Sequence, residues 1–318
     1  MTTYKEIRGT NIEAVASDPS NPVEGQVWYN TTTNVVKGLI NNLGSWATAN
    51  NMNTARNVLA GAGTQTAALA FGGGTPPNTA ITESYNGTNW TEVNDLNTAR
   101  SSLGGCGTNT AALGFGGYLT PGYTALTELW NGTNWTEVND LNIGVTLVAG
   151  AGTNTAALAF GGTSAETPPT EAKTELWNGT NWTEVNNMNT AKESGGGLGI
   201  QTAALAFGGA PVPAATELWN GTNWTAVNNL NTGRIRLAAA GISTAGLAFG
   251  GSPTTGATES WNGSNWTEVG DLGTARSNLA GSTAGTNAAA LAFGGNPPLL
   301  AATEEFSAGP ATVTFDVS

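Results

Sequence analysis

One unit of sequence recurs along the chain, and a clear copy of it reads TARSSLGGCGTNTAALGFGGYLTPGYTALTELWNGTNWTEV (residues 98–138). Its alternation of polar and apolar residues, broken by turn residues, predicts four short antiparallel strands. We expect these strands at roughly 101–105, 110–115, 126–130 and 135–138. Asn131-Gly132, between the last two, is a strong hairpin signal because both residue types accept a positive φ.

Two markers show how often the unit repeats. A Gly-Gly pair ends the expected second strand of each copy and a Trp begins the expected fourth, and both series are spaced by 42–47 residues. The pairs begin at Gly72, Gly116, Gly161, Gly208, Gly250 and Gly294, and the tryptophans are Trp46, Trp90, Trp135, Trp182, Trp224 and Trp266. Repeats of this period predict four-stranded sheets packed face to face in a closed ring.

The order of markers within a copy resembles the kelch repeat. An Arg precedes strand one, Gly-Gly ends strand two, an aromatic lies on strand three and Trp begins strand four, over about residues 45–306. Val145 and Lys192 replace the Arg in the third and fourth copies. The resemblance implies an all-β fold: a six-bladed kelch-type β-propeller of four-stranded antiparallel blades at 45–318, after a short β-hairpin segment at 1–44. We expect the aromatics to fill the wide outer gaps between blades, and Ala and Gly to suit the narrow centre.

The sequence leaves the closure of the ring open. Trp46 begins a fourth strand with no copy before it, and the last copy stops after its third strand at Phe306, so the Trp46 strand could complete the last blade. The strand-like tail at 311–317 fits the same gap. A composite seventh blade, made from this tail, 26–30, 35–40 and Trp46, is a further alternative to six blades.

The first 44 residues differ from the repeats. Residues 25–30 and 35–39 predict a hairpin around 31–34. The phrase EGQVWYNTTTN (24–34) resembles a segment common in bacteriophage tail and fibre proteins, where it often precedes an appended binding module. With the Gly/Asn/Thr-rich propeller, the chain is similar to kelch-type tail and fibre structural proteins of marine and cyanobacterial phages. This resemblance implies that residues 1–44 anchor the chain to other virion proteins.

Composition narrows the chemistry. The chain has no His, which excludes Ser-His-Asp catalysis and His-ligated metals, and its one cysteine, Cys106, cannot form an internal disulfide. The net charge of −12 disfavours nucleic acid and anionic lipid as partners. No apolar run could span a membrane, and the first residues lack a signal-peptide pattern. We therefore expect a protein that is not an enzyme and needs no cofactor or metal. The phage resemblance implies that it is made in the host cytoplasm and resides in the virion.

A glutamate recurs on strand three of every copy. The six residues are Glu83, Glu128, Glu175, Glu217, Glu259 and Glu304. Enzyme sites on propellers usually break the symmetry, so we interpret this series as structural, pairing with backbone amides or with the Arg series. A sialidase-type site would need clustered Arg, a Tyr nucleophile and acids; Arg234 and Arg236 are the only close Arg pair.

The loops between strands two and three vary most and carry most of the prolines. Their candidate recognition residues are Pro76, Pro77, Tyr118, Tyr123, Pro168, Pro169, Pro211, Pro253 and Pro297. Antiparallel geometry places these loops on one face with the connections between blades, whereas uniform turns occupy the other face. Divergent loops on a repeated core favour a recognition surface, on which Tyr118 and Tyr123 would stack on a sugar or peptide. Drift in unconstrained loops is the alternative.

These features predict a phage structural protein, associated with the tail or a fibre, whose propeller binds a host-surface glycan or protein. The alternatives are an architectural decoration or collar protein and a polysaccharide-degrading hydrolase or lyase. A homo-oligomer, either a trimer or a ring, is also consistent with a place in the particle.

Overall fold

The computed structural model describes residues 12–23, 25–165 and 170–315, and these contain strands and turns but no helix. The chain forms two compact units. One is Ser45–Ser307, and the other combines Met1–Gly44 with Ala308–Ser318. We had expected the propeller to extend from residue 45 to residue 318, but its C-terminal limit lies at Ser307 and the last residues group with the N-terminal segment.

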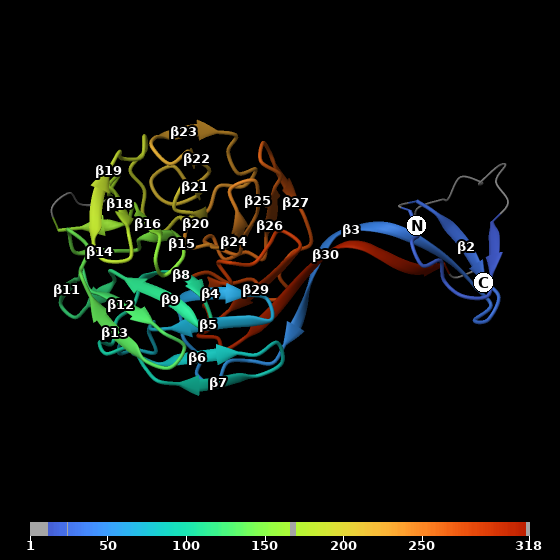
Figure 1. Cartoon of the computed structure of the whole chain (residues 1–318), viewed down its shortest axis with the longest axis horizontal. Helices are drawn as coiled ribbons and strands as arrows, with labels where there is room; N and C mark the ends of the chain where they lie inside the picture. The colour runs from blue at the N-terminus through green and yellow to red at the C-terminus, as the bar shows by residue number, and fades with distance from the viewer. Residues whose placement is uncertain (1–11, 24, 166–169, 316–318) are drawn as a thin grey trace. The chain divides into compact units, whose positions relative to one another are not determined.

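Six blades of four strands make up the propeller: five are separate four-stranded sheets, and the sixth is formed by four strands of a six-stranded sheet. The first strand of each blade lies towards the centre and the fourth at the rim (Figure 1). Neighbouring strands within a blade are antiparallel, as predicted. Blade one is β4 (Ala60–Thr64), β5 (Ala67–Phe71), β6 (Thr82–Tyr85) and β7 (Trp90–Val93); blade two is β8 (Gly104–Thr108), β9 (Ala111–Phe115), β12 (Thr127–Trp130) and β13 (Trp135–Val138); blade three is β15 (Ala149–Gly152), β16 (Ala157–Phe160), β18 (Thr174–Trp177) and β19 (Trp182–Val185); blade four is β20 (Gly196–Ile200), β21 (Ala203–Phe207), β22 (Thr216–Trp219) and β23 (Trp224–Val227); blade five is β24 (Ala238–Ile242), β25 (Ala245–Phe249), β26 (Thr258–Trp261) and β27 (Trp266–Glu268).

The sixth blade combines the two ends of the propeller unit. It consists of β28 (Ala280–Gly281), β29 (Ala289–Phe293), β30 (Thr303–Phe315) and β3 (Val35–Ala49), in that order. Trp46 on β3 lies 5.2 Å from Phe306 on β30 between ring centroids, so the Trp46 strand closes the ring. The tail does not compete for this place, because its described part continues β30. The described residues form no seventh four-stranded blade, since 26–30 and 35–40 lie along β2 (Val27–Asn30) and β3.

The first strand of blade two begins later than the sequence indicates. In blade two we expected it at 101–105, but β8 begins at Gly104. Ser101 forms an isolated bridge with Tyr118 on a neighbouring loop, and Ser102 has a φ of 54°, which interrupts the extended backbone. A residue in this left-handed conformation cannot continue a β-strand.

Packing between blades follows the expected division into large and small residues. Trp135 of blade two contacts Phe71 of blade one at 4.8 Å and Trp130 of its own blade at 5.4 Å, and its indole N–H donates to Thr82 Oγ1 (3.1 Å). Nearer the centre, a Cβ on Gly105 would lie 2.7 Å from the Phe71 ring, so the position has no room for a side chain. These contacts confirm that aromatics fill the outer gap and small residues the centre.

The predicted N-terminal hairpin is confirmed. β2 pairs antiparallel with β3, with Trp28 opposite Lys37, and β1 (Glu13–Val15) adds a parallel strand. Trp28 is fully buried. Asp18 accepts hydrogen bonds from Lys37 Nζ (2.8 Å), Asn30 Nδ2 (2.8 Å) and Trp28 Nε1 (3.0 Å), and these contacts, that with Lys37 above all, lower the pKa of Asp18 to about 2.

The last part of β30, from Ala308 on, packs within this small unit. A Cβ added to Gly38 would lie 2.8 Å from Cε2 of the Phe315 ring, so the ring fits there only because Gly38 has no side chain. This aromatic packing holds the last part of β30 against β3 within the unit.

Candidate functional site

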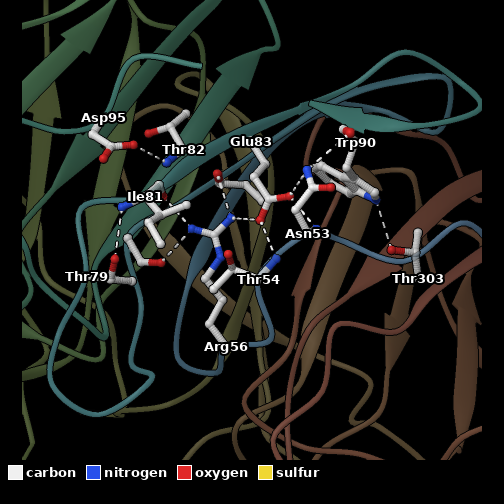
Figure 2. A network of polar contacts seen from close by, with 12 residues as sticks. Asn53, Thr54, Arg56, Thr79, Ile81, Thr82, Glu83, Trp90, Asp95 and Thr303 are labelled. Atoms are coloured by element: carbon white, nitrogen blue, oxygen red, sulfur yellow. Dashed lines mark hydrogen bonds and ion pairs between the residues drawn. The ribbon is translucent and has the colours of Figure 1, made fainter. Parts of the chain in front are cut away.

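The repeated glutamates lie in the core and pair with the repeated basic residues. In blade one, Arg56 Nη2 lies 3.0 Å from Glu83 Oε1, and the backbone and side-chain N–H groups of Asn53 donate to Glu83 Oε2 at 2.6 and 2.9 Å (Figure 2). Arg56 and Glu83 are both fully buried. The same ion pair recurs as Arg100–Glu128 (2.6 Å), Arg234–Glu259 (2.9 Å) and Arg276–Glu304 (2.8 Å). The structural interpretation of this series is therefore confirmed.

Blades three and four depart from this pattern. Lys192 Nζ lies 3.9 Å from Glu217, a looser pair than those of the arginines, and burial lowers the pKa of Lys192. Val145 leaves Glu175 with no Lys or Arg within 4.0 Å in the described part of the chain, although Asn142 donates to it through N (2.9 Å) and Nδ2 (2.6 Å). Burial raises the pKa of Glu175, because no cation offsets the loss of water.

An open basin of about 370 Å³ lies on the propeller axis, on the face that carries the loops between strands two and three. It leads towards a narrower space of about 140 Å³ lined by the inner strands. The residues around the basin come from all six blades and their connections: Val58, Ser101, Ser102, Tyr118, Tyr123, Thr146, Leu147, Thr163, Glu193, Arg236 and Asn278. The set combines aromatic, hydroxyl, amide and charged groups in one concave place, which is typical of a ligand site.

Tyr118 and Tyr123 both line this basin. They belong to a small hairpin of β10 (Tyr118–Leu119) and β11 (Gly122–Tyr123), which pairs them directly and sets their ring centroids 6.1 Å apart. Asn78 of the neighbouring loop donates Nδ2 to the Tyr118 carbonyl (2.8 Å), and Tyr123 is 41% exposed. Two adjacent aromatic rings are thus held at the edge of the basin.

The predicted prolines lie elsewhere on the loops. Pro76, Pro77, Pro211, Pro253 and Pro297 are exposed and none of them lines the basin. Pro168 and Pro169 lie outside the described residues. Among the candidate loop residues whose structure is described, only the tyrosines therefore meet at the basin.

The two neighbouring arginines have separate environments. Arg234 is buried in its pair with Glu259, whereas Arg236 is exposed at the basin. In the described ranges the guanidinium of Arg236 has neither an ion pair nor a hydrogen bond. Glu193, the acid of the basin, accepts a hydrogen bond from the Thr163 hydroxyl. The sialidase-type arrangement of convergent arginines does not form from this pair.

Our reading of the sequence missed most of the basin residues. Val58, Ser102, Leu147, Arg236 and Asn278 occupy one equivalent position, two residues after the Arg position of each copy. That position differs in almost every copy, while the residue after it is Leu in four of the six. A comparison of the copies position by position would have found this contrast.

A second hollow, of about 360 Å³, lies beside blade five, but its main polar groups are already used. Arg234 pairs with Glu259, and Asp271 Oδ1 accepts the backbone N–H of Thr258 (3.1 Å). Within residues 12–23, 25–165 and 170–315, no group of three or more acids or cysteines is placed to hold a metal ion, and no helix is long and apolar enough to cross a membrane. The basin on the axis is therefore the better candidate.

Comparison with known proteins bears on the fold. No protein-family model matches the chain, and no curated protein matches it in sequence. Among solved structures, the chain is similar to the one titled "Structure of YjhT", with a TM-score of 0.67 at 10% identity, over 83% of this chain and 99% of that chain. At this identity the likeness concerns the fold alone. With its six blades of four antiparallel strands, the chain is an all-β protein with the fold of a six-bladed kelch-type β-propeller.

Proposed function

We propose that this chain is a binding protein, in which the propeller recognises a carbohydrate of a host-cell surface and the N-terminal segment attaches it to other proteins of a phage particle. The observation that carries the proposal is the basin on the propeller axis, where Tyr118 and Tyr123 lie beside hydroxyl, amide and charged groups. Its position on the variable face agrees with a role in recognition.

The chemistry of the basin favours a sugar. The apolar faces of pyranose rings pack on aromatic side chains, and Tyr118 and Tyr123 provide two such surfaces. Sugar hydroxyls need donors and acceptors, which Ser101, Thr146 and Asn278 provide around the rim. A volume of about 370 Å³ is in the range of small-molecule sites, and the open mouth suits the end or a branch of a longer glycan.

The use of the charged groups supports binding over catalysis. A glycosidase needs two carboxyl groups across one bond, yet most of the strand-three glutamates are held in ion pairs within the blades. In the part of the chain that the structure describes, Glu193 is the carboxylate that lines the basin. A single acid with an arginine and two tyrosines is better suited to hold a ligand than to cleave it.

The N-terminal unit supports the attachment role. Within it β1, β2 and the N-terminal part of β3 pair with one another, Trp28 is fully buried and a polar cluster surrounds Asp18. A compact unit distinct from the propeller is consistent with a separate partner, and its sequence resembles segments of phage tail and fibre proteins.

Binding of the full chain to an array of bacterial surface glycans tests the proposal. We expect a subset of glycans to bind, and Tyr118→Ala with Tyr123→Ala to weaken binding at least tenfold, equivalent to about 1.4 kcal/mol. Val212→Ala is the matched control, since Val212 is an exposed loop residue that does not line the basin. Absence of binding to any glycan, or equal binding by all variants, would refute the proposal, and release of new reducing ends would instead favour the hydrolase alternative.

A further inference from the structure

In each blade, the residue two positions before the first strand takes part in a closed ring of backbone hydrogen bonds. We call the six of them the ring residues: Val58, Ser102, Leu147, Ser194, Arg236 and Asn278. Each donates its N–H to the carbonyl oxygen of the ring residue before it, at 2.7–3.2 Å, and Val58 completes the circle by donating to Asn278. The ring therefore follows the order of the blades around the axis.

All six ring residues have a left-handed backbone, with φ between 47° and 57°. Glycine adopts this conformation most easily, whereas a β-branched residue such as Val58 is an outlier there. The chain contains 45 glycines and places glycine at many other positions of positive φ, yet none of the ring residues is glycine. Strained backbone conformations cluster at functional sites. We therefore infer that the side chains at these positions have a function that compensates for the strain.

The ring residues differ in type from blade to blade, whereas the residue that follows each of them in the sequence is mostly the same. Val, Ser, Leu, Ser, Arg and Asn follow one another around the ring, while the next residue is Leu59, Leu103, Leu237 or Leu279 in four of the blades. These leucines are buried in the packing. All the ring residues except Ser194 line the basin. Variation is thus concentrated where a side chain faces the basin, and the fold beneath it stays the same.

The order of the blades also places a positive charge and an aromatic surface on opposite sides of the basin. Arg236, on blade five, is three hydrogen-bond steps from Ser102, on blade two, so the two are opposite each other across the axis. Blade two also carries the Tyr118–Tyr123 hairpin. Among the described residues that line the basin, Arg236 is the one cation, and its guanidinium is exposed.

We propose that the ring residues are the specificity positions of the propeller, and that their present set selects an acidic saccharide, whose carboxylate pairs with Arg236 while its sugar face packs on Tyr118 and Tyr123. This inference rests on the proposed function. The hydrogen-bonded backbone holds the ring in place whatever its side chains are, so that recognition can change without loss of the fold.

The test compares two probes of equal length, a galacturonate trisaccharide and the neutral galactose trisaccharide, by titration calorimetry on the full chain. We expect the acidic probe to bind at least tenfold more tightly. Arg236→Gly abolishes that preference, while Val58→Gly, which keeps the cation, retains it. Val212→Ala again serves as the control outside the basin.

Thermal unfolding of the same variants separates recognition from packing. Because glycine accepts the left-handed backbone, Arg236→Gly and Val58→Gly leave the melting temperature unchanged or raise it by about 1–2 °C. A drop of several degrees would show that these side chains stabilise the fold and would overturn the inference.

The outcomes are distinguishable from a failure of the proposed function. If other glycans bind and depend on the tyrosines, but the acidic probe has no advantage or keeps it in Arg236→Gly, this inference is wrong and the proposed function stands. If no saccharide binds, both are wrong.

Discussion

Replacing Glu128 with Gln leaves Arg100 as a buried cation without its anion. Arg100 is fully buried and Glu128 is 1% exposed, and their charged groups lie 2.6 Å apart. Asn97 adds two hydrogen bonds to the same carboxylate, at 2.7 and 2.8 Å. Removal of one partner from a buried pair costs about 3–5 kcal/mol, chiefly because the remaining charge has no water around it.

Blade three supplies the matched control. Glu175 occupies the equivalent position, but Val145 replaces the arginine. Glu175→Gln therefore leaves no buried cation without its partner. The amide of Gln can still accept hydrogen bonds from Asn142 through its oxygen, and the desolvation of a carboxylate is relieved. We expect a loss of no more than about 1 kcal/mol.

Chemical unfolding followed by Trp fluorescence measures the difference. Glu128→Gln lowers the free energy of unfolding by about 3–5 kcal/mol, or the melting temperature by on the order of 10 °C, and Glu175→Gln changes both by little. Adding Arg100→Val to Glu128→Gln recovers part of the loss, since the valine of blade three shows that this site accepts an apolar residue. Equal losses in the two single variants would refute the reasoning.

Three further predictions follow from burial. Burial raises the folded-state pKa of Glu175 above its ordinary value of 4.5, so its contribution to stability is present below pH 4.5 and is lost as the pH rises through the folded-state pKa. The stability of Glu175→Gln relative to the wild type therefore increases as the pH rises above 4.5, which unfolding curves at several pH values check. Cys106 is fully buried, which raises the pKa of its thiol to about 12, so it does not react with a thiol reagent at pH 8 until denaturant is added; reaction in the native state would contradict its burial. Trp46→Ala removes the indole that contacts Phe249 and donates to Thr258 Oγ1 (3.0 Å), and we expect a loss of about 2–3 kcal/mol in unfolding experiments, whereas an unchanged midpoint would argue against closure by this strand.

Much of the fold could be predicted from the sequence because its determinants are local. Asn131-Gly132 specifies a hairpin turn between β12 and β13, and the alternation around Leu129 specifies strands with two buried faces. Six copies of the same markers specify six blades. The role of the strand-three glutamates could also be predicted, because a residue kept in every copy serves the packing that every copy shares.

The closure of the ring and the composition of the basin depended on tertiary structure. The choice between the Trp46 strand and the C-terminal tail is made by the pairing of β3 with β30, which lie more than 250 residues apart in the sequence. Tyr118 and Tyr123 were predictable as candidates, but no sequence pattern placed Arg236 opposite them. Each blade contributes one side chain to the ring, and its neighbours there come from other copies about 45 residues away.

The sequence by itself therefore determined the repeat, its strands and the buried ion pairs, since these follow from contacts within a blade and its neighbour. Only the tertiary structure decided which side chains meet on the axis. The physical reason is that a closed ring brings six distant segments to one centre, where the backbone of each must turn left-handed to complete the circle of hydrogen bonds.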